Sequence, residues 1–222
     1  MDCLEYMKQV PNKYFDLIIT DPPYGINYGG QLKGKGDGKG GVDKNGWREW
    51  DAPDWDERRP SKEVFKEMLR ISKNQVIWGG NYFADILDPK QCWLVWDKGQ
   101  REFSLADAEL AWTSFDSSVR VFTMSRGQFM YGLNENRKHP TQKPVALGRW
   151  ILNKYAQKGD KIMDPFMGSG SFIVACKQLG YEYVGCELEP KYCKIAENRL
   201  KQGNLQDILK GVCKREGGSN GH

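Results

Sequence analysis

Histidine is nearly absent from this chain of 222 residues, which contains only His139 and His222. Nucleophilic catalysis of the Ser-His or Cys-His kind therefore depends on one internal candidate. A metal site made of several histidines is excluded for the same reason. The chemistry of this chain must rest on other side chains.

Long apolar runs and paired cysteines are also missing. No apolar segment approaches the ~18–20 residues of a membrane-spanning helix, and the start of the chain lacks the pattern of a signal peptide. The six cysteines include no C-x-x-C pair, so we expect reduced side chains that lie mostly in the core. Together these absences predict a cytoplasmic protein with no membrane partner.

The charge of the chain is close to balanced, with a formal net charge of +4. This mild basicity permits a nucleic-acid partner but does not require one, because the usual footprint is a strongly basic domain with clustered Lys and Arg. Hydrophobic residues make up 39% of the chain, which is enough to bury the core of one domain.

Strand-like and helix-like segments alternate along the chain. The predicted strands are 15–20, 75–78, 92–96, 109–113, 119–123, 161–163 and 183–187. The predicted helices are 61–72, 144–155, 171–179 and 190–201. Such alternation predicts a three-layer α/β domain with a mostly parallel sheet.

A glycine-rich turn separates a predicted strand from a predicted helix, over residues 164–170. Gly168 and Gly170 let the backbone approach a ligand closely, and the N-terminus of the helix offers unpaired N–H groups to an anion. Glu187 ends the next predicted strand, where a carboxylate can hold both hydroxyls of a ribose. The pattern predicts a nucleoside-containing cofactor, and Ile173 in place of a third glycine disfavours NAD or FAD.

The run Asp21-Pro22-Pro23-Tyr24 ends the first predicted strand, because neither proline can donate a hydrogen bond to a sheet. Its groups suit an exocyclic amine on a base, which is a poor nucleophile because its lone pair is delocalised into the ring. The Asp21 carboxylate and the Pro22 carbonyl can accept both N–H bonds of that amine and push its nitrogen toward tetrahedral geometry. Tyr24 supplies a flat surface on which a base can stack.

Four sequence blocks together resemble the amino-methylating DNA methyltransferases that use S-adenosylmethionine, most closely the β class, in which the catalytic motif precedes the cofactor motif. The blocks are Asp21-Pro22-Pro23-Tyr24, His139-Pro140-Thr141-Gln142-Lys143-Pro144, Asp164-Pro165-Phe166-Met167-Gly168-Ser169-Gly170 and Gly185-Cys186-Glu187. Weaker matches at 76–83, 93–98 and 108–112 extend the resemblance from Asp2 to about Lys201. It implies a Rossmann-like three-layer α/β/α sandwich with a mostly parallel sheet and a permuted order of motifs.

The resemblance also implies a role for each motif. Asp21, Pro22, Pro23 and Tyr24 are the expected catalytic residues, which bind and orient the target base. The residues expected to bind the cofactor are Asp2, Cys3, Asp21, Thr141, Lys143, Asp164, Phe166, Gly168, Ser169, Gly170, Ser171 and Glu187. Within that set, Glu187 holds the ribose, while Thr141 and Lys143 border the methionine end. His139 is expected to be a structural or pocket residue rather than a base, and no metal is expected.

Family members usually carry a strand before the Asp2-Cys3-Leu4 block, and we expect that edge strand to be missing here. We expect a single methyltransferase domain over 1–213, with a mobile loop at 25–59, a target-recognition insertion at about 115–138 and a flexible tail at 214–222. The side chains expected to contact DNA are Lys33, Lys35, Lys39, Arg120, Arg126 and Arg137. The run Gly29-x-x-x-x-Gly34-Lys35 is not expected to be a P-loop, because Gly36 replaces the Ser or Thr that holds Mg²⁺.

The expected activity is transfer of a methyl group from S-adenosylmethionine to the N6 amine of adenine, flipped out of a short double-stranded DNA site. We expect it in a bacterial or phage-infected cell, in the setting of restriction-modification. The N4 amine of cytosine remains an alternative, although the cytosine enzymes more often begin the tetrapeptide with Ser. RNA and protein glutamine are weaker alternatives, and a DNA-binding module without activity is a further one. Both a monomer and a homodimer remain open.

Overall fold

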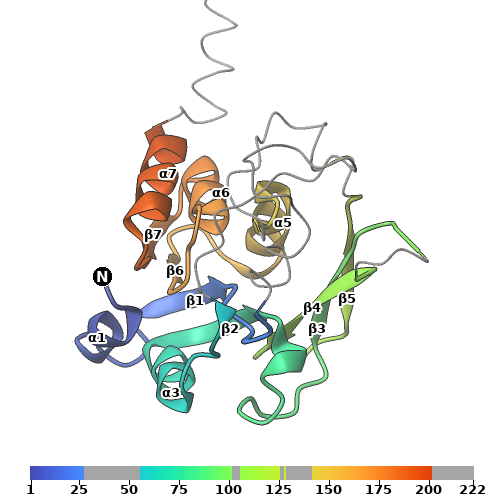
Figure 1. Ribbon diagram of the computed structural model, residues 1–222, viewed down its shortest axis with the longest axis horizontal. Coiled ribbons are helices and arrows are strands. Elements are labelled where there is room, and N and C mark those ends of the chain that lie inside the picture. Colours follow the sequence, from blue (N-terminus) through green and yellow to red (C-terminus); the bar gives the residue numbers. More distant parts are fainter. Residues whose placement is uncertain (28–55, 102–105, 126–127, 129–141, 202–222) are drawn as a thin grey trace, which may run out of the picture.

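The computed structural model describes residues 1–27, 56–101, 106–125, 128 and 142–201, and these form one mixed sheet covered by helices (Figure 1). The strands are β1 (Phe15–Thr20), β2 (Ser72–Trp78), β3 (Trp93–Asp97), β4 (Ala108–Thr113), β5 (Arg120–Thr123), β6 (Lys161–Asp164) and β7 (Glu182–Gly185). The α-helices are α1 (Cys3–Lys8), α3 (Lys62–Ile71), α5 (Val145–Tyr155), α6 (Ser171–Leu179) and α7 (Pro190–Lys201). A 3₁₀ turn, Gly80–Tyr82, follows β2.

The strand order in the described part of the sheet is β5-β3-β4-β2-β1-β6-β7. The pairs β1–β2, β1–β6, β6–β7 and β3–β5 are parallel, while β4 runs antiparallel to both β2 and β3. The carboxyl ends of β1, β2, β6 and β7 therefore meet at one edge of the sheet. Because β4 runs the other way, its first residues lie at that same edge.

Helices cover both faces of the sheet. Helices α5, α6 and α7 lie on one face, and α1 and α3 lie on the other (Figure 1). The strands serve two cores because successive side chains point to opposite faces. Leu17 and Ile19 of β1 face α5 and α6, whereas Ile18 between them packs in the cluster that contains Phe65 of α3. The predicted α/β/α sandwich with a mostly parallel sheet is confirmed.

The turns at the carboxyl edge have local causes in the sequence. Strand β1 ends at Thr20, directly before the two prolines. Helix α6 lies between Gly170 and Gly180, which both adopt the left-handed backbone conformation, with φ of 80° and 78°. Such a conformation is open to glycine at little cost. These turns bring the polar motifs out at the edge of the sheet.

Parts of the predicted domain layout lie outside the described residues, including most of the loop at 25–59 and the tail at 214–222. Residues 120–123 form β5 of the main sheet, so this part of the predicted insertion at 115–138 belongs to the sheet. Among the described residues, no helix is long and apolar enough to cross a membrane, and no group of side chains could hold a metal ion.

Candidate active site

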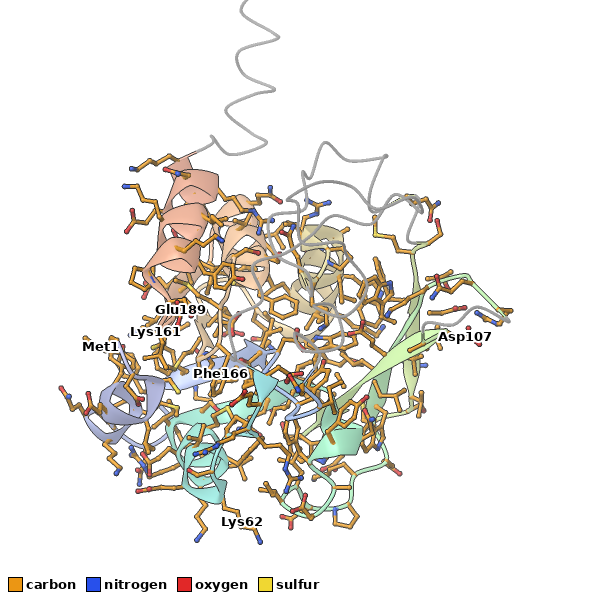
Figure 2. All side chains as sticks on the ribbon, in the orientation of Figure 1. Met1, Lys62, Asp107, Lys161, Phe166 and Glu189 are labelled. Carbon is orange, nitrogen blue, oxygen red and sulfur yellow. The ribbon has the colours of Figure 1, made fainter. Side chains whose placement is uncertain are left out.

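A cavity of about 650 Å³ opens at the carboxyl edge of the sheet. This volume lies within the ordinary range for small-molecule sites. The predicted site residues that line it are Cys3, Asp21, Pro22, Pro23, Tyr24, Lys143, Asp164, Phe166, Gly168, Ser169, Ser171 and Glu187. Asp2 and Gly170 do not line the cavity, and Thr141 and His139 lie outside the described residues. Figure 2 shows Met1, Phe166 and Glu189, which also line it, on one side of the molecule.

The turn after β6 forms one wall of the cavity. Gly168 has a left-handed backbone with φ of 51°, and a Cβ added there would meet nothing within 4 Å. Ser169 and Ser171 are buried beside it, at the start of α6. This wall combines open space above a glycine, hydroxyl groups and the N-terminus of a nine-residue helix. These features fit the polar end of a nucleoside-containing cofactor.

Helix α7 fixes this turn through a residue that sequence reasoning missed. Nη1 of Arg199 donates to the carbonyl oxygen of Ser169 at 2.8 Å, and lies 3.2 Å and 3.1 Å from the hydroxyl oxygens of Ser169 and Ser171. On the other side, the Ser169 hydroxyl donates to Oε1 of Gln142 at 3.3 Å. The only sequence signal was an arginine late in the last predicted helix.

Asp164 ends β6 and is buried at the base of the cavity. Its Oδ1 accepts from the Thr20 hydroxyl at 2.8 Å and from the Phe166 backbone N–H at 3.1 Å. Burial raises the pKa of Asp164 to about 7, against the opposing effect of these two hydrogen bonds. The residue ties the ends of β1 and β6 together.

The end of β7 and the start of the chain form the opposite wall. The amino group of Met1 donates to the backbone carbonyl of Glu187 at 3.1 Å. Oε1 of Glu187 accepts from the Glu189 backbone N–H at 2.8 Å, and the side chain lines the cavity. Asp2 caps α1 instead, and its Oδ1 accepts from the Leu4 and Glu5 amides at 2.7 Å and 3.2 Å. The predicted contact between Asp2 and the cofactor stays a prediction.

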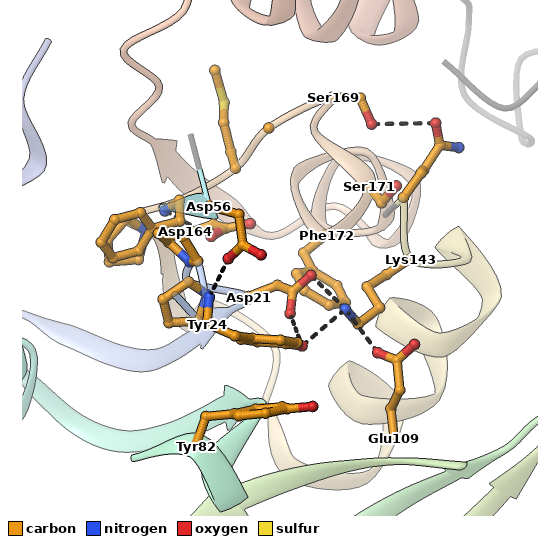
Figure 3. Close-up of a pocket in the computed structure, with 18 of the residues that line it drawn as sticks. Asp21, Tyr24, Asp56, Tyr82, Glu109, Lys143, Asp164, Ser169, Ser171 and Phe172 are labelled. Carbon is orange, nitrogen blue, oxygen red and sulfur yellow. Dashed lines mark hydrogen bonds and ion pairs between the residues drawn. The ribbon is translucent and has the colours of Figure 1, made fainter. Parts of the chain in front are cut away.

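Asp21 and Tyr24 contact each other at the inner end of the cavity. The Tyr24 hydroxyl donates to Oδ1 of Asp21 at 2.6 Å (Figure 3). Burial, reinforced by the charge of Asp21, raises the pKa of Tyr24 well above its usual value, so the hydroxyl stays protonated and donates. Burial also raises the pKa of Asp21, although Lys143 opposes this shift. The turn holds a carboxylate whose acceptor oxygens face the cavity.

Asp56 fixes the conformation of this turn. Its Oδ1 accepts from the backbone N–H groups of Tyr24 at 2.7 Å and Gly25 at 3.0 Å. Asp56 is buried, so the charge-assisted bonds act in a poorly hydrated place. No sequence pattern indicated this residue, because it follows a long segment after the tetrapeptide.

The Tyr24 ring lies against two residues that follow β2, Gly79 and Tyr82. Tyr82 stacks on it, with ring centroids 4.7 Å apart and an angle of 14° between the rings (Figure 3). A Cβ added to Gly79 would fall 2.1 Å from the Tyr24 ring, so only glycine leaves room for the ring there. Tyr82 was not predicted as a site residue, although it lies in the weak block at 76–83.

Asp21 is one of four charged side chains that meet at this end of the cavity, together with Lys143, Glu109 and Lys98. The ammonium of Lys143 donates to Oδ2 of Asp21 and lies 3.0 Å from Oε2 of Glu109 (Figure 3). Lys98 lies 2.7 Å from Oε1 of the same glutamate. Although burial raises the pKa of Glu109, the attraction of Lys143 and Lys98 outweighs it and lowers that pKa to about 2. Attraction to Asp21 and Glu109 likewise outweighs burial and raises the pKa of Lys143.

The structure thus places Lys143 in contact with both Asp21 and Glu109. Sequence reasoning missed these contacts and did not identify Glu109 as a site residue.

Of the side chains predicted to contact DNA, the structure describes only Arg120, at the start of β5. This position is at the end of the sheet opposite the cavity, because β5 runs parallel to β1 through β3 and β4. The placement does not favour contact between Arg120 and DNA next to the target base. Lys33, Lys35, Lys39, Arg126 and Arg137 lie outside the described residues.

Known proteins share both the sequence and the architecture of this chain. The family of N6 and N4 methyltransferases, described as DNA methylase, matches residues 88–198. The type II methyltransferase M.HinfI of Haemophilus influenzae is 30% identical over 90% of this chain and 67% of its own length. The M1.HpyAVI–SAM complex superposes with a TM-score of 0.56 and 24% identity, over 90% of this chain and 96% of that one.

A second solved structure shares the fold at lower identity. PvuII DNA methyltransferase, which is cytosine-N4-specific, superposes with a TM-score of 0.58 and 13% identity, over 97% of this chain and 90% of that one. This chain therefore shares its fold with a methyltransferase that is cytosine-N4-specific, so the fold by itself does not identify the target base. From the family match and the similarity to M.HinfI, this chain belongs to the N6/N4 DNA methylase family and is a DNA methyltransferase.

Proposed function

We propose that this chain transfers the methyl group of S-adenosylmethionine to the N6 amine of adenine in double-stranded DNA. The observation that carries the proposal is the position of Asp21 in the same cavity as the Gly168 turn and Glu187. One cavity thus joins a carboxylate suited to an amine with a wall suited to a nucleoside cofactor. Asp21, rather than serine, at the head of the tetrapeptide favours adenine over cytosine.

The cofactor end of the cavity lies between the turn after β6 and the end of β7. Glu187 would hold the ribose hydroxyls, and Gly168 would lie under the cofactor with Ser169 and Ser171 near its polar end. When bound, S-adenosylmethionine supplies an electrophilic methyl group, whose transfer to the amine nitrogen leaves a neutral thioether and releases one proton. Arg199 holds both serines in place from α7.

Asp21 and Pro22 would orient the amine. The carboxylate of Asp21 accepts one N–H bond and the carbonyl of Pro22 accepts the other, which directs the nitrogen lone pair toward the methyl group. Both residues line the cavity, and Asp56 fixes the turn that carries them. Acceptors whose positions are fixed by the turn lower the barrier once the amine is bound to them.

The target base must leave the double helix to reach Asp21, at a cost of a few kcal/mol. Stacking against aromatic rings recovers part of that cost, about 1–3 kcal/mol per base. Tyr24 and Tyr82 provide two stacked aromatic rings in the wall of the cavity, and Tyr82 is 38% exposed. The extruded base has an apolar surface beside the carboxylate that recognises it.

Replacement of Asp21 by alanine tests the proposal. We expect Asp21→Ala to abolish incorporation of tritiated methyl groups into amplified, and hence unmethylated, genomic DNA. The variant should still bind S-adenosylmethionine in calorimetry, because Gly168 and Glu187 remain. Asp116→Ala is a matched control, since Asp116 is 82% exposed and lies outside the cavity. Near-normal turnover by Asp21→Ala would refute the assignment of the site.

The alternatives predict different products in the same assay. Label in N4-methylcytosine would move the target to cytosine, and label in RNA or a protein glutamine would replace DNA as the substrate. If the protein bound S-adenosylmethionine but no substrate became labelled, the remaining interpretation would be a DNA-binding module without activity. Light scattering of the purified protein distinguishes a monomer from a homodimer. We place the reaction in the cytoplasm of a bacterial or phage-infected cell, where DNA and S-adenosylmethionine meet.

A further inference from the structure

The base end of the cavity contains a cation where the proposed function needs an amine. The Lys143 ammonium donates to Oδ2 of Asp21, while the Tyr24 hydroxyl donates to Oδ1. Only 5% of the Lys143 side chain and 18% of the Asp21 side chain are exposed. Both oxygens of the carboxylate thus have donors from the chain itself, and a target amine must compete with one of them.

A neutral amine competes poorly with an ammonium for a buried carboxylate. Removing the carboxylate from a buried cation leaves a charge without a partner, which is strongly unfavourable. The competition changes if a second carboxylate holds the same cation. Glu109 is in that position, with Oε2 3.0 Å from the Lys143 nitrogen.

Glu109 is itself fixed and ionised. Lys98 lies 2.7 Å from Oε1 of Glu109, and its ammonium lies 5.3 Å from the centre of the Trp96 ring of β3. The glutamate comes from the second residue of β4, which pairs with β3 in the sheet. Strand β4 therefore fixes the backbone of Glu109 and Lys98 holds one of its carboxylate oxygens, while the other oxygen faces Lys143 (Figure 3).

We propose that Glu109 is a positioning residue, which retains the Lys143 ammonium when the target amine takes its place on Asp21. This inference rests on the proposed function, since it concerns the same amine site. In this arrangement Lys143 fills the position of the amine between reactions, and Glu109 makes that position exchangeable. Lys143 acts through Asp21 and Glu109 and need not touch the base.

A double-mutant cycle tests the inference. Glu109→Gln keeps the shape but removes the charge, so Lys143 should stay on Asp21 and slow methyl transfer by about ten- to hundredfold. Lys143→Met removes the competing cation, so adding Glu109→Gln to it should change the rate little. The measurement is the single-turnover rate on a duplex that carries the site mapped by sequencing of treated DNA. Glu63→Gln, at an exposed pair with Lys8, is the control.

The cycle distinguishes this role from a structural one. Equal losses from Glu109→Gln in both backgrounds, or no loss in either, would overturn the inference. If Glu109→Gln does not fold, the charge-balanced variant Glu109→Gln with Lys98→Met replaces it in the cycle. The methylated base identified in the same products reports separately on the proposed function, because N4-methylcytosine would refute adenine specificity without affecting the cycle.

The pH profile gives a second measurement that does not need an active Lys143 variant. The charged and titratable groups around Asp21 are Lys143, Tyr24, Glu109 and, at the end of β6, Asp164. The Glu109 charge helps to raise the pKa of Asp21. Glu109→Gln should therefore move the acid limb of the single-turnover rate to lower pH while lowering the plateau. A plateau rate that stays at the level of the parent protein would contradict the inference, because the exchange of Lys143 for the amine would then not need the Glu109 charge.

Discussion

A single methyl group added at Gly168 should weaken cofactor binding while lowering the stability of the fold only slightly. In Gly168→Ala the new Cβ meets no atom of the chain within 4 Å, yet Gly168 lines the cavity. The added methyl group would therefore occupy space that the cofactor needs. Gly170, two residues later, is the opposite case, since its Cβ would fall 2.9 Å from Cβ of Ala196.

The expected magnitudes follow from this geometry. An alanine in the left-handed conformation costs about 1–2 kcal/mol of folding free energy, which applies to Gly168→Ala. Gly170→Ala adds overpacking against α7, for a total of about 2–5 kcal/mol. Gly159 is a matched control, because its φ is 95° and its Cβ would also meet nothing, but it lies outside the cavity. Gly159→Ala should lose about 1–2 kcal/mol without affecting the cofactor.

Urea denaturation and calorimetry with S-adenosylmethionine measure the two effects separately. We expect Gly168→Ala to bind the cofactor about tenfold or more weakly, since a misplaced methyl group in a fitted site has effects of this size. Gly159→Ala should bind it as tightly as the parent protein. If Gly168→Ala bound the cofactor as tightly as Gly159→Ala, the placement of the cofactor over the Gly168 turn would be wrong.

Three further outcomes are expected. Asp164→Asn keeps the acceptor for Thr20 but removes a buried charge. Because the pKa of Asp164 is about 7 in the folded protein against an ordinary 3.8, the stability linked to Asp164 is present below pH 4 and is lost as the pH rises through 7. In urea titrations the variant should therefore have a free energy of unfolding about 1–4 kcal/mol higher than the parent protein at pH 8, and no higher at pH 4. Asp56→Ala leaves two turn amides without their acceptor and should lose about 1–3 kcal/mol of stability together with most methylation, whereas Asp56→Asn should keep much of both. Tyr82→Ala removes a stacked ring worth about 0.5–1.5 kcal/mol and should raise KM for DNA in steady-state assays, while Tyr82→Phe should not.

Much of the fold could be predicted because its elements carry local signals. The prolines after β1, the glycines around α6 and the apolar runs of the strands are visible in the sequence. Strand β2 begins at Ser72 rather than at the predicted Gln75, because its polar first residues pair with β1, where Phe15 lies beside Ser72. Helix α1 has only six residues, which is too short for helix propensity alone to stabilise it, so the Asp2 cap and packing against α3 do so.

The site was harder to predict where distant segments meet. Asp21, Gly168 and Glu187 lie in the turns that follow the parallel strands β1, β6 and β7, and the carboxyl-edge rule brings them together. Glu109 begins a strand, and such a residue reaches the same edge only because β4 is antiparallel. Asp56 acts across a long segment of the chain, and Arg199 acts from the last described helix. These contacts depend on how the strands are ordered and on which distant segments come together in the fold, and the local sequence pattern does not contain that information.

The most direct measurement identifies the methylated base. Amplified genomic DNA is treated with the protein and S-adenosylmethionine, digested to nucleosides and analysed by mass spectrometry, in parallel with the Asp21→Ala variant. We expect N6-methyladenine with the parent protein and none with the variant, because Asp21 orients the adenine amine. N4-methylcytosine, or equal N6-methyladenine from both proteins, would contradict this expectation.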